Sequence, residues 1–335
     1  MKTKKPQNLA YIIIILMLAA NFSIINFTSA AHTVVSNDVI FSGYIQDRPP
    51  TTPSSVISTE LIDYSGFSSS RVTEWTNLLV AQGIPEYTLR IPAFGDWSDG
   101  VLSGSWESVS KQLITAADSV GIKVNIDLHT WFTTWDNFFD NDASEYAANR
   151  ATYLQYIGDA LDAFEETSVN AFMVLNEPQA QSASSGENQF ILDCISTAKL
   201  HTSRPVSVRF MAGYSPTTGH YSEAIDVASD FLCRNTYWDP RNPGRSVYGT
   251  TEVKMNTLID YSNTVGKPLW ITEFGSSSSD AEVQRAYVEG FVAYAKSRGI
   301  DAVFCWASQF GGTSESYNIF VGTSAKPAFF ELVNS

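Results

Sequence analysis

The sequence predicts a single (β/α)8 barrel, the TIM-barrel fold, that follows an N-terminal signal peptide. From about Val56 onward, short apolar runs typical of buried parallel strands alternate with segments of helical period, and the number of such pairs approaches eight. The length agrees, because 335 residues with 44% hydrophobic content can fill one large core and a barrel takes about 250 residues. No fixed-period repeat points to a solenoid instead.

Residues 1–31 are predicted to be the signal peptide and 32–335 the barrel domain. A lysine-rich start at 2–5 precedes an apolar run at 9–20, and small residues at 28–31 suit cleavage. We therefore expect a secreted, monomeric protein with no stable membrane association after cleavage.

The alternative to cleavage is an anchor that keeps the protein at the cell surface. Residues 9–27 are just long enough to span a bilayer. Asn21, Ser23 and Asn26 would make the second half of that span costly in hydrocarbon, which favours export with cleavage.

The first half of the barrel is predicted from residues that end strands and helices. A first strand is expected before Phe67. Gly83 and Gly121 are placed to close the first two helices, and Pro92, which has no N–H, ends the second strand. The other elements are helix 70–81, strand 87–91, helix 106–120, strand 124–129, helix 144–164 and strand 172–175.

The second half of the barrel is predicted from the same alternation of helices and strands. Gly299 closes a long helix ahead of the last strand. The expected elements are helix 187–200, strand 206–211, helix 223–228, strand 231–237, helix 252–265, strand 269–273, helix 280–298, strand 302–306 and a short helix 327–333.

Composition narrows the function. The formal net charge of −14 argues against a nucleic-acid partner, because no basic stripe displaces phosphate counterions. Three cysteines are too few for a disulfide framework or a cysteine metal site. With no His-x-x-x-His pair and no acidic calcium loop, we expect neither metal nor cofactor.

Two predicted strands end in a glutamate. Glu177 follows strand 172–175 and precedes Pro178, and Glu273 ends strand 269–273. Active sites of (β/α)8 barrels lie at the C-terminal strand ends, so glutamates three βα units apart can project into one mouth from nearly opposite walls. Paired carboxyl groups across a neutral substrate are what glycosidic cleavage requires. The structural alternative is two unrelated glutamates in turns.

Two cationic or titratable side chains lie at neighbouring strand ends. Arg90 ends the second strand and is a permanently charged donor that can hold an attacking carboxylate ionised, or else close the barrel with a structural ion pair. His129 ends the third strand, where it is as suited to a structural hydrogen bond as to a site.

Aromatic residues gather near the same strand ends and predict a sugar-stacking cleft. A phenol can donate to a carboxylate and an indole can stack on a pyranose, although core packing is the commoner role of any one tryptophan. The residues are Tyr237 and Trp306 at strand ends, with Trp97, Trp131, Trp135 and Trp238 in the loops that follow strands.

The chain resembles glycoside hydrolase family 5, the retaining β-glycanases of clan A, over residues 70–306. Five motifs in the family's order carry the resemblance. They are Leu89-Arg90-Ile91-Pro92, Ile126-Asp127-Leu128-His129, Leu175-Asn176-Glu177-Pro178, Ile271-Thr272-Glu273-Phe274-Gly275 and Phe304-Cys305-Trp306.

The resemblance implies a (β/α)8 endo-β-1,4-glucanase that hydrolyses cellulose-type polysaccharide in two steps. It makes Glu177 the general acid/base and Glu273 the nucleophile. The same resemblance implies that Asn176 bonds the substrate 2-hydroxyl and that Arg90 and Tyr237 position Glu273. It also implies that His129 and Trp306 line the −1 subsite.

One motif departs from the family. The sixth strand usually carries His-x-Tyr, and this chain has Asn235-Thr236-Tyr237. We therefore expect the histidine's role to be altered or taken over by Asn235.

Other functions stay open at this point. Loops select the sugar, so mannan, xylan and β-1,3-glucan are possible substrates. A non-catalytic carbohydrate-binding barrel would use the same aromatic cleft. A metal-dependent hydrolase could be built on Asp127 and His129.

Overall fold

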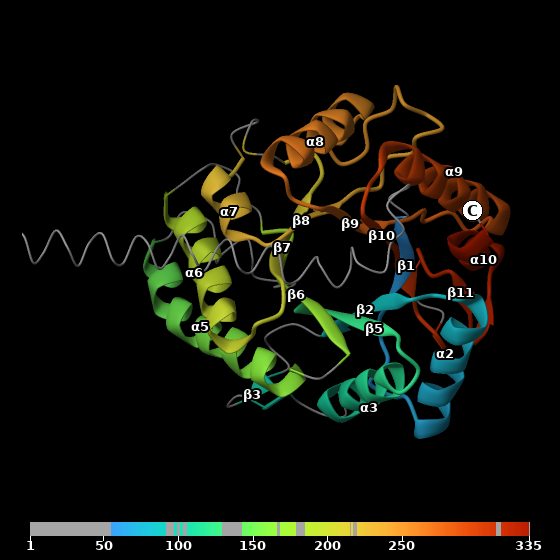
Figure 1. Ribbon diagram of the computed structural model, residues 1–335, viewed down its shortest axis with the longest axis horizontal. Helices are drawn as coiled ribbons and strands as arrows, with labels where there is room; N and C mark the ends of the chain where they lie inside the picture. The colour runs from blue at the N-terminus through green and yellow to red at the C-terminus, as the bar shows by residue number, and fades with distance from the viewer. Residues whose placement is uncertain are drawn as a thin grey trace, which may run out of the picture. The chain divides into compact units, whose positions relative to one another are not determined.

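Eight parallel strands close into a barrel surrounded by helices in the computed structural model (Figure 1). Within the compact unit Pro53–Ser335, neighbouring barrel strands follow the order β1, β10, β9, β8, β7, β6, β5, β2. The predicted (β/α)8 fold is confirmed. The structure describes residues 55–91, 97–98, 101–102, 106–128, 143–165, 168–178, 185–214, 216, 220–312 and 316–334, so the predicted signal peptide lies outside the described residues.

Strands and helices alternate along the chain as the apolar pattern predicted. The barrel strands are β1 (Val56–Leu61), β2 (Glu86–Ile91), β5 (Lys123–Leu128), β6 (Val169–Asn176), β7 (Val206–Met211), β8 (Leu232–Asn235), β9 (Leu269–Phe274) and β10 (Ala302–Ser308). The helices of the described residues are α2 (Ser69–Gln82), α3 (Trp106–Asp118), α5 (Ala143–Phe164), α6 (Ser185–His201), α7 (Glu223–Ala228), α8 (Glu252–Val265), α9 (Ala281–Arg298) and α10 (Pro327–Asn334).

Local capping explains where the helices begin and end. The Ser68 side chain accepts a hydrogen bond from the Arg71 N–H at the start of α2, and the Asp280 carboxylate accepts two backbone N–H bonds at the start of α9. Gly83 and Gly299 end these helices with φ of 67°, a left-handed conformation that favours glycine.

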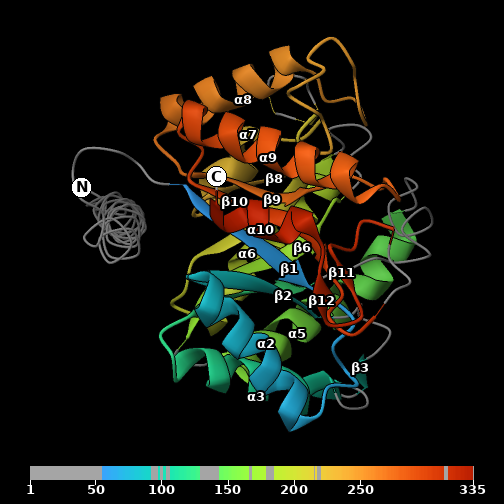
Figure 2. The same cartoon turned by 90° about the vertical axis from the view of Figure 1, so that its right-hand side faces the viewer.

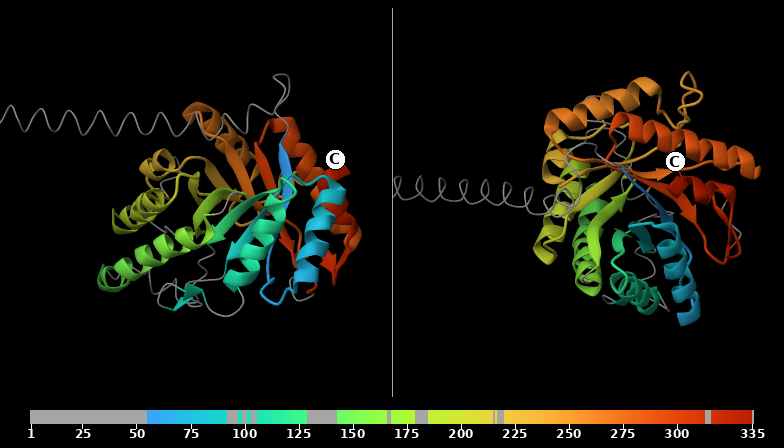
Figure 3. Two further views of the ribbon diagram at one scale, coloured as in Figure 1. Left: turned by 60° about the horizontal axis from the view of Figure 1, so that its bottom comes forward. Right: turned by 45° about the vertical axis from the view of Figure 1, so that its right-hand side comes forward.

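The barrel closes where the first strand meets the last. Strand β1 pairs in parallel with both β10 and β2, and β1 and β10 lie side by side in Figure 2. The views in Figure 3 show helices ringing the strands. Because every strand lies between the barrel interior and a helix layer, the strands are nearly continuous runs of buried residues.

Four short strands were not predicted. β3 (Trp97–Ser98) pairs antiparallel with β4 (Val101–Leu102), and β11 (Phe320–Val321) with β12 (Ser324–Ala325). Two residues are too few to show an alternating pattern.

Strand β8 is shorter than predicted, since it spans 232–235 and not 231–237. Tyr237 therefore lies in the loop beyond the strand. None of the described helices is both long and apolar enough to cross a membrane.

Candidate active site

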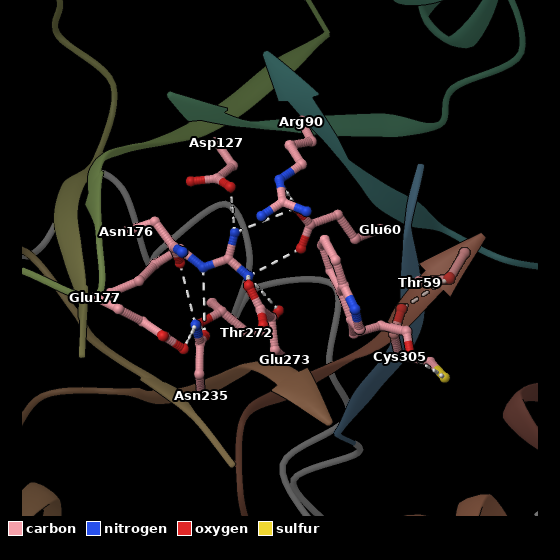
Figure 4. A network of polar contacts seen from close by, with 12 residues as sticks. Thr59, Glu60, Arg90, Asp127, Asn176, Glu177, Asn235, Thr272, Glu273 and Cys305 are labelled. Atoms are coloured by element: carbon pink, nitrogen blue, oxygen red, sulfur yellow. Dashed lines mark hydrogen bonds and ion pairs between the residues drawn. The ribbon is translucent and has the colours of Figure 1, made fainter. Parts of the chain in front are cut away.

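One layer of the barrel interior is ionic. Barrel interiors are filled by layers of four side chains from alternate strands, usually branched and apolar. Here four charged or titratable residues from alternate strands meet at the C-terminal end, and the carboxyl groups of Glu60, Asp127 and Glu273 surround one guanidinium group in Figure 4. They are Glu60 on β1, Asp127 on β5, Arg209 on β7 and Glu273 on β9.

Arg209 is the centre of this layer, and its side chain has no exposed surface. Its Nη2 donates to Glu60 Oε2 at 2.9 Å and to Glu273 Oε1 at 2.8 Å. Its Nη1 lies 2.5 Å from Asp127 Oδ2. Burial acts to lower the pKa of Arg209, but the three carboxylates outweigh it and raise the pKa well above its ordinary value. The guanidinium therefore stays charged.

Glu273 is held at both carboxyl oxygens. Arg209 donates to Oε1, and the Tyr237 hydroxyl donates to Oε2 at 2.5 Å. Burial raises the pKa of Glu273 to about 8, Arg209 opposes the rise, and the charges of Glu177 and Glu60 add to it. Burial also raises the pKa of Tyr237 well above its usual value, so the phenol remains a donor.

Glu177 has a different environment, half-buried and next to a neutral amide. Asn235 Nδ2 donates to Glu177 Oε1 at 2.8 Å and to Asn176 Oδ1 at 3.1 Å. The Glu177 backbone has φ of 48°, and its N–H donates to the carbonyl of Arg209 at 2.8 Å. This left-handed conformation is uncommon for a non-glycine residue and is often found at functional sites.

Asn235 links Glu177 to Arg209, the residue that holds Glu273, and its bond to Glu177 is drawn in Figure 4. Its Oδ1 accepts hydrogen bonds from Thr272 Oγ1 at 2.8 Å and from Arg209 Nε at 3.4 Å, while its Nδ2 donates to Glu177. A buried amide that both donates and accepts can fix the orientations of Glu177 and Arg209 together.

Arg90 lies at the same end of the barrel beside Trp306. Its guanidinium is 3.9 Å from the centre of the Trp306 ring, and its Nε is 4.0 Å from Glu60 Oε1. Arg209, which was not expected from the sequence, donates a hydrogen bond to Glu273. The charge of Arg90 still acts to lower the pKa of Glu273.

Tyrosines continue the aromatic surface on the Glu273 side. Trp306 packs with Tyr237 and Tyr317, whose ring centres are 5.1 Å apart. Tyr248 lies 5.7 Å from Tyr237 and is 64% exposed. Its φ is 46°, so a large aromatic residue is held out in a strained backbone conformation. The sequence analysis had singled out neither Tyr248 nor Tyr317.

The predicted tryptophan cleft is only partly described. Trp238 is 1% exposed and packs edge-on against Tyr294, so its predicted place in the cleft is wrong. Its position just after a strand had suggested exposure, but the backbone turns it toward helix α9. Trp131 and Trp135 lie outside the described residues, as does His129, and the side chain of Trp97 is not described.

Close backbone packing requires the glycine at position 275, just after the strand that carries Glu273. A Cβ at Gly275 would lie 2.4 Å from the carbonyl oxygen of Trp306. Real Cβ atoms do not approach backbone this closely, so the ends of β9 and β10 can meet only with glycine here.

No group of His, Cys, Asp or Glu side chains in the described part of the chain is arranged to hold a metal ion. Cys194, Cys233 and Cys305 are buried free thiols, and burial raises the pKa of each.

No family model matches the sequence, and no curated protein matches it.

Solved structures with the same fold include glycoside hydrolases. A GH113 β-1,4-mannanase gives a TM-score of 0.64 at 15% identity, covering 83% of this chain and 98% of that one. An endo-β-1,4-glucanase from Xanthomonas axonopodis pv. citri, a triple mutant, gives 0.61 at 13% identity, covering 84% and 98%. A β-glucuronidase from Ruminococcus gnavus gives 0.62 at 14% identity over 83% of this chain, which spans only 50% of that enzyme. At these identities the likeness shows a shared fold.

Proposed function

We propose that the chain is a retaining β-glycoside hydrolase that cleaves internal β-1,4 linkages of a neutral polysaccharide. The observation that carries this proposal is the contrast between two glutamates at the C-terminal end of one barrel. Glu273 is held by a cation and a phenol, and Glu177 by a neutral amide. Unlike environments for two carboxyl groups are how one site holds both an acid and a nucleophile.

The environments assign the roles. Glu273 receives a charge-assisted hydrogen bond from Arg209 and a second bond from Tyr237, which fix its direction and favour its anion against the burial that raises its pKa. It is the nucleophile that attacks the anomeric carbon. The Glu177 carboxyl group accepts a hydrogen bond from the neutral amide of Asn235. Glu177 carries the proton that the leaving oxygen takes.

The second step follows from the charge change. Once Glu273 is esterified, its negative charge no longer opposes ionisation of Glu177. Glu177 then accepts a proton from water, and this water cleaves the glycosyl ester. Asn176, whose Oδ1 is fixed by Asn235, can donate through its own amide N–H to the 2-hydroxyl of the sugar.

The substrate class rests on charge and on the aromatic surface. A net charge of −14 disfavours binding of anionic polymers. The aromatic surface is suited to stacking against sugar rings, and its residues are Trp306, Tyr317, Tyr237 and Tyr248. The family 5 resemblance favours β-1,4-glucan. Barrels of the same fold include a β-1,4-mannanase and an endo-β-1,4-glucanase, which supports mannan equally.

A substrate panel tests the proposal. The protein would be incubated with carboxymethylcellulose, β-mannan, xylan and β-1,3-glucan, with and without a chelator, and new reducing ends measured. We expect cleavage of the glucan or the mannan that the chelator does not change. Activity lost in chelator would support the metal-dependent alternative, and no cleavage with retained polysaccharide binding would support a non-catalytic barrel.

Tyr248 is predicted to stack on a sugar next to the cleaved bond. Tyr248→Ala should lower kcat/KM on polysaccharide about two- to tenfold, because an aromatic contact contributes roughly 0.5–1.5 kcal/mol. Hydrolysis of an aryl glycoside that fills only the −1 subsite should not change, and Tyr248→Phe should keep activity on both. Equal losses on both substrates in Tyr248→Ala would show that the residue acts within the −1 subsite instead.

We also propose that the enzyme acts outside the cell, on the strength of the predicted signal peptide at residues 1–31. Mass spectrometry of protein from the culture medium would test it. A mature N-terminus near residue 32 is expected, and intact residues 1–31 on a cell-surface protein would favour the anchor.

A further inference from the structure

The ionic layer contains more acidic groups than cations. Glu60, Asp127 and Glu273 all contact Arg209, and none is more than 5% exposed. Among the described residues, Arg90 brings the second positive charge, 4.0 Å from Glu60. Three buried carboxylates against two guanidinium groups would leave one negative charge uncompensated, and an uncompensated buried charge is costly.

The contacts indicate where a compensating proton would lie. Arg209 Nη1 is 2.5 Å from Asp127 Oδ2 and 3.3 Å from Glu60 Oε1, so oxygens of both carboxyl groups meet at one nitrogen. Ionised carboxylates only accept hydrogen bonds, so two of them that approach the same nitrogen repel each other unless one carries a proton.

Glu273 is a poorer place for that proton. Both of its oxygens accept hydrogen bonds, one from Arg209 and one from Tyr237. Hydrogen bonds donated to both oxygens favour the anion.

We propose that Glu60 and Asp127 share a single proton, and that this shared proton allows Arg209 to hold Glu273 as an anion. The pair then carries one negative charge and Glu273 another, which balance Arg209 and Arg90. Glu60 and Asp127 are positioning residues that act through Arg209. The inference rests on the proposed function only in naming Glu273 as the nucleophile.

Burial raises the pKa of all three carboxyl groups of the layer, which favours retention of a proton among them. Burial raises the pKa of Glu60. Arg209 acts to lower this pKa, and Asp127 acts to raise it further. Burial likewise raises the pKa of Asp127, whereas Arg209 and Arg90 act to lower it. Two carboxyl groups that share a site titrate as a pair, so one proton is retained after the other is lost. The titratable or charged groups facing the pair among the described residues are Arg90 on β2, Arg209 on β7, Cys233 on β8, Glu273 on β9 and Tyr64 after β1.

Isosteric amides test the shared proton through the pH dependence of kcat/KM. Glu60→Gln or Asp127→Asn removes the proton but leaves the pair with one negative charge. The acid-side midpoint should therefore stay where it is in the wild type. Glu60→Gln/Asp127→Asn removes that charge, strengthens the pull of Arg209 on Glu273, and should move the midpoint about one unit lower.

Each other outcome overturns the proposal. A midpoint that already falls in both single variants means that both groups are ionised in the wild type. A midpoint that is unchanged in the double variant means that the pair does not set the charge of Glu273.

Infrared difference spectroscopy tests the proton without using activity. In a Glu177→Gln background, which removes the proton of the proposed general acid, the protein at pH 7 should show the carbonyl stretch of one protonated carboxyl group, because exposed carboxyl groups are ionised there. The band should persist in Glu273→Gln and be absent from the double amide variant. A band lost in Glu273→Gln would place the proton on the nucleophile and overturn the inference. If the wild type cleaved no glycan, the proposed function would fail while this measurement still decided the state of the pair.

Discussion

Glu273→Ala should abolish hydrolysis of polysaccharide and aryl glycosides alike, with a loss on the order of 10⁴-fold or more. No leaving group compensates for a missing attacking carboxylate. The fold should survive, because Arg209 keeps Glu60 and Asp127 as charge partners. The measurements are rates on both substrates and a thermal melt, with Glu74→Ala on the exposed face of α2 as the matched control.

Azide should rescue Glu273→Ala on an activated aryl glycoside. The anion can enter the space left by the carboxylate and attack from the same face, giving a glycosyl azide of inverted anomeric configuration. Rescue of Glu177→Ala to an inverted azide, with none for Glu273→Ala, would reverse the two roles.

The second large effect is expected for Glu177→Ala and depends on the leaving group. On unactivated oligosaccharides the loss should be at least about 10²-fold, in line with general-acid contributions. On an aryl glycoside whose leaving group needs no proton, the first step should remain fast and the glycosyl-enzyme should accumulate, seen as a burst of phenol. A loss of the same size on both substrates, without a burst, would mean that Glu177 does not protonate the leaving group.

Much of the fold was predictable from the sequence, because buried parallel strands are apolar throughout and the helices between them end at glycines. Gly83 and Gly299 close their helices as expected. Strand β8 was predicted too long because Thr236 and Tyr237 suit strands by composition, while the end of its ladder depends on pairing with β9.

The candidate site was only partly predictable. Strand-end position pointed to Glu177 and Glu273, and the family 5 resemblance pointed to Asn235, but Arg209 was read simply as part of a strand. The overlooked signal is a single arginine within the apolar run 206–211, since a buried charge must have partners. Its partners could not be read from the sequence, because they come from strands β1, β5 and β9, which only barrel closure brings together.

The most direct test of the account is the anomeric configuration of the first product. Wild-type enzyme would be mixed with a soluble β-1,4-oligosaccharide of the preferred sugar, and proton NMR spectra would be recorded before mutarotation equilibrates the new reducing ends. Two successive displacements, first by Glu273 and then by water, predict that the β-anomer appears first. If the α-anomer appeared first, water would have attacked the sugar directly, and Glu273 would not be a nucleophile.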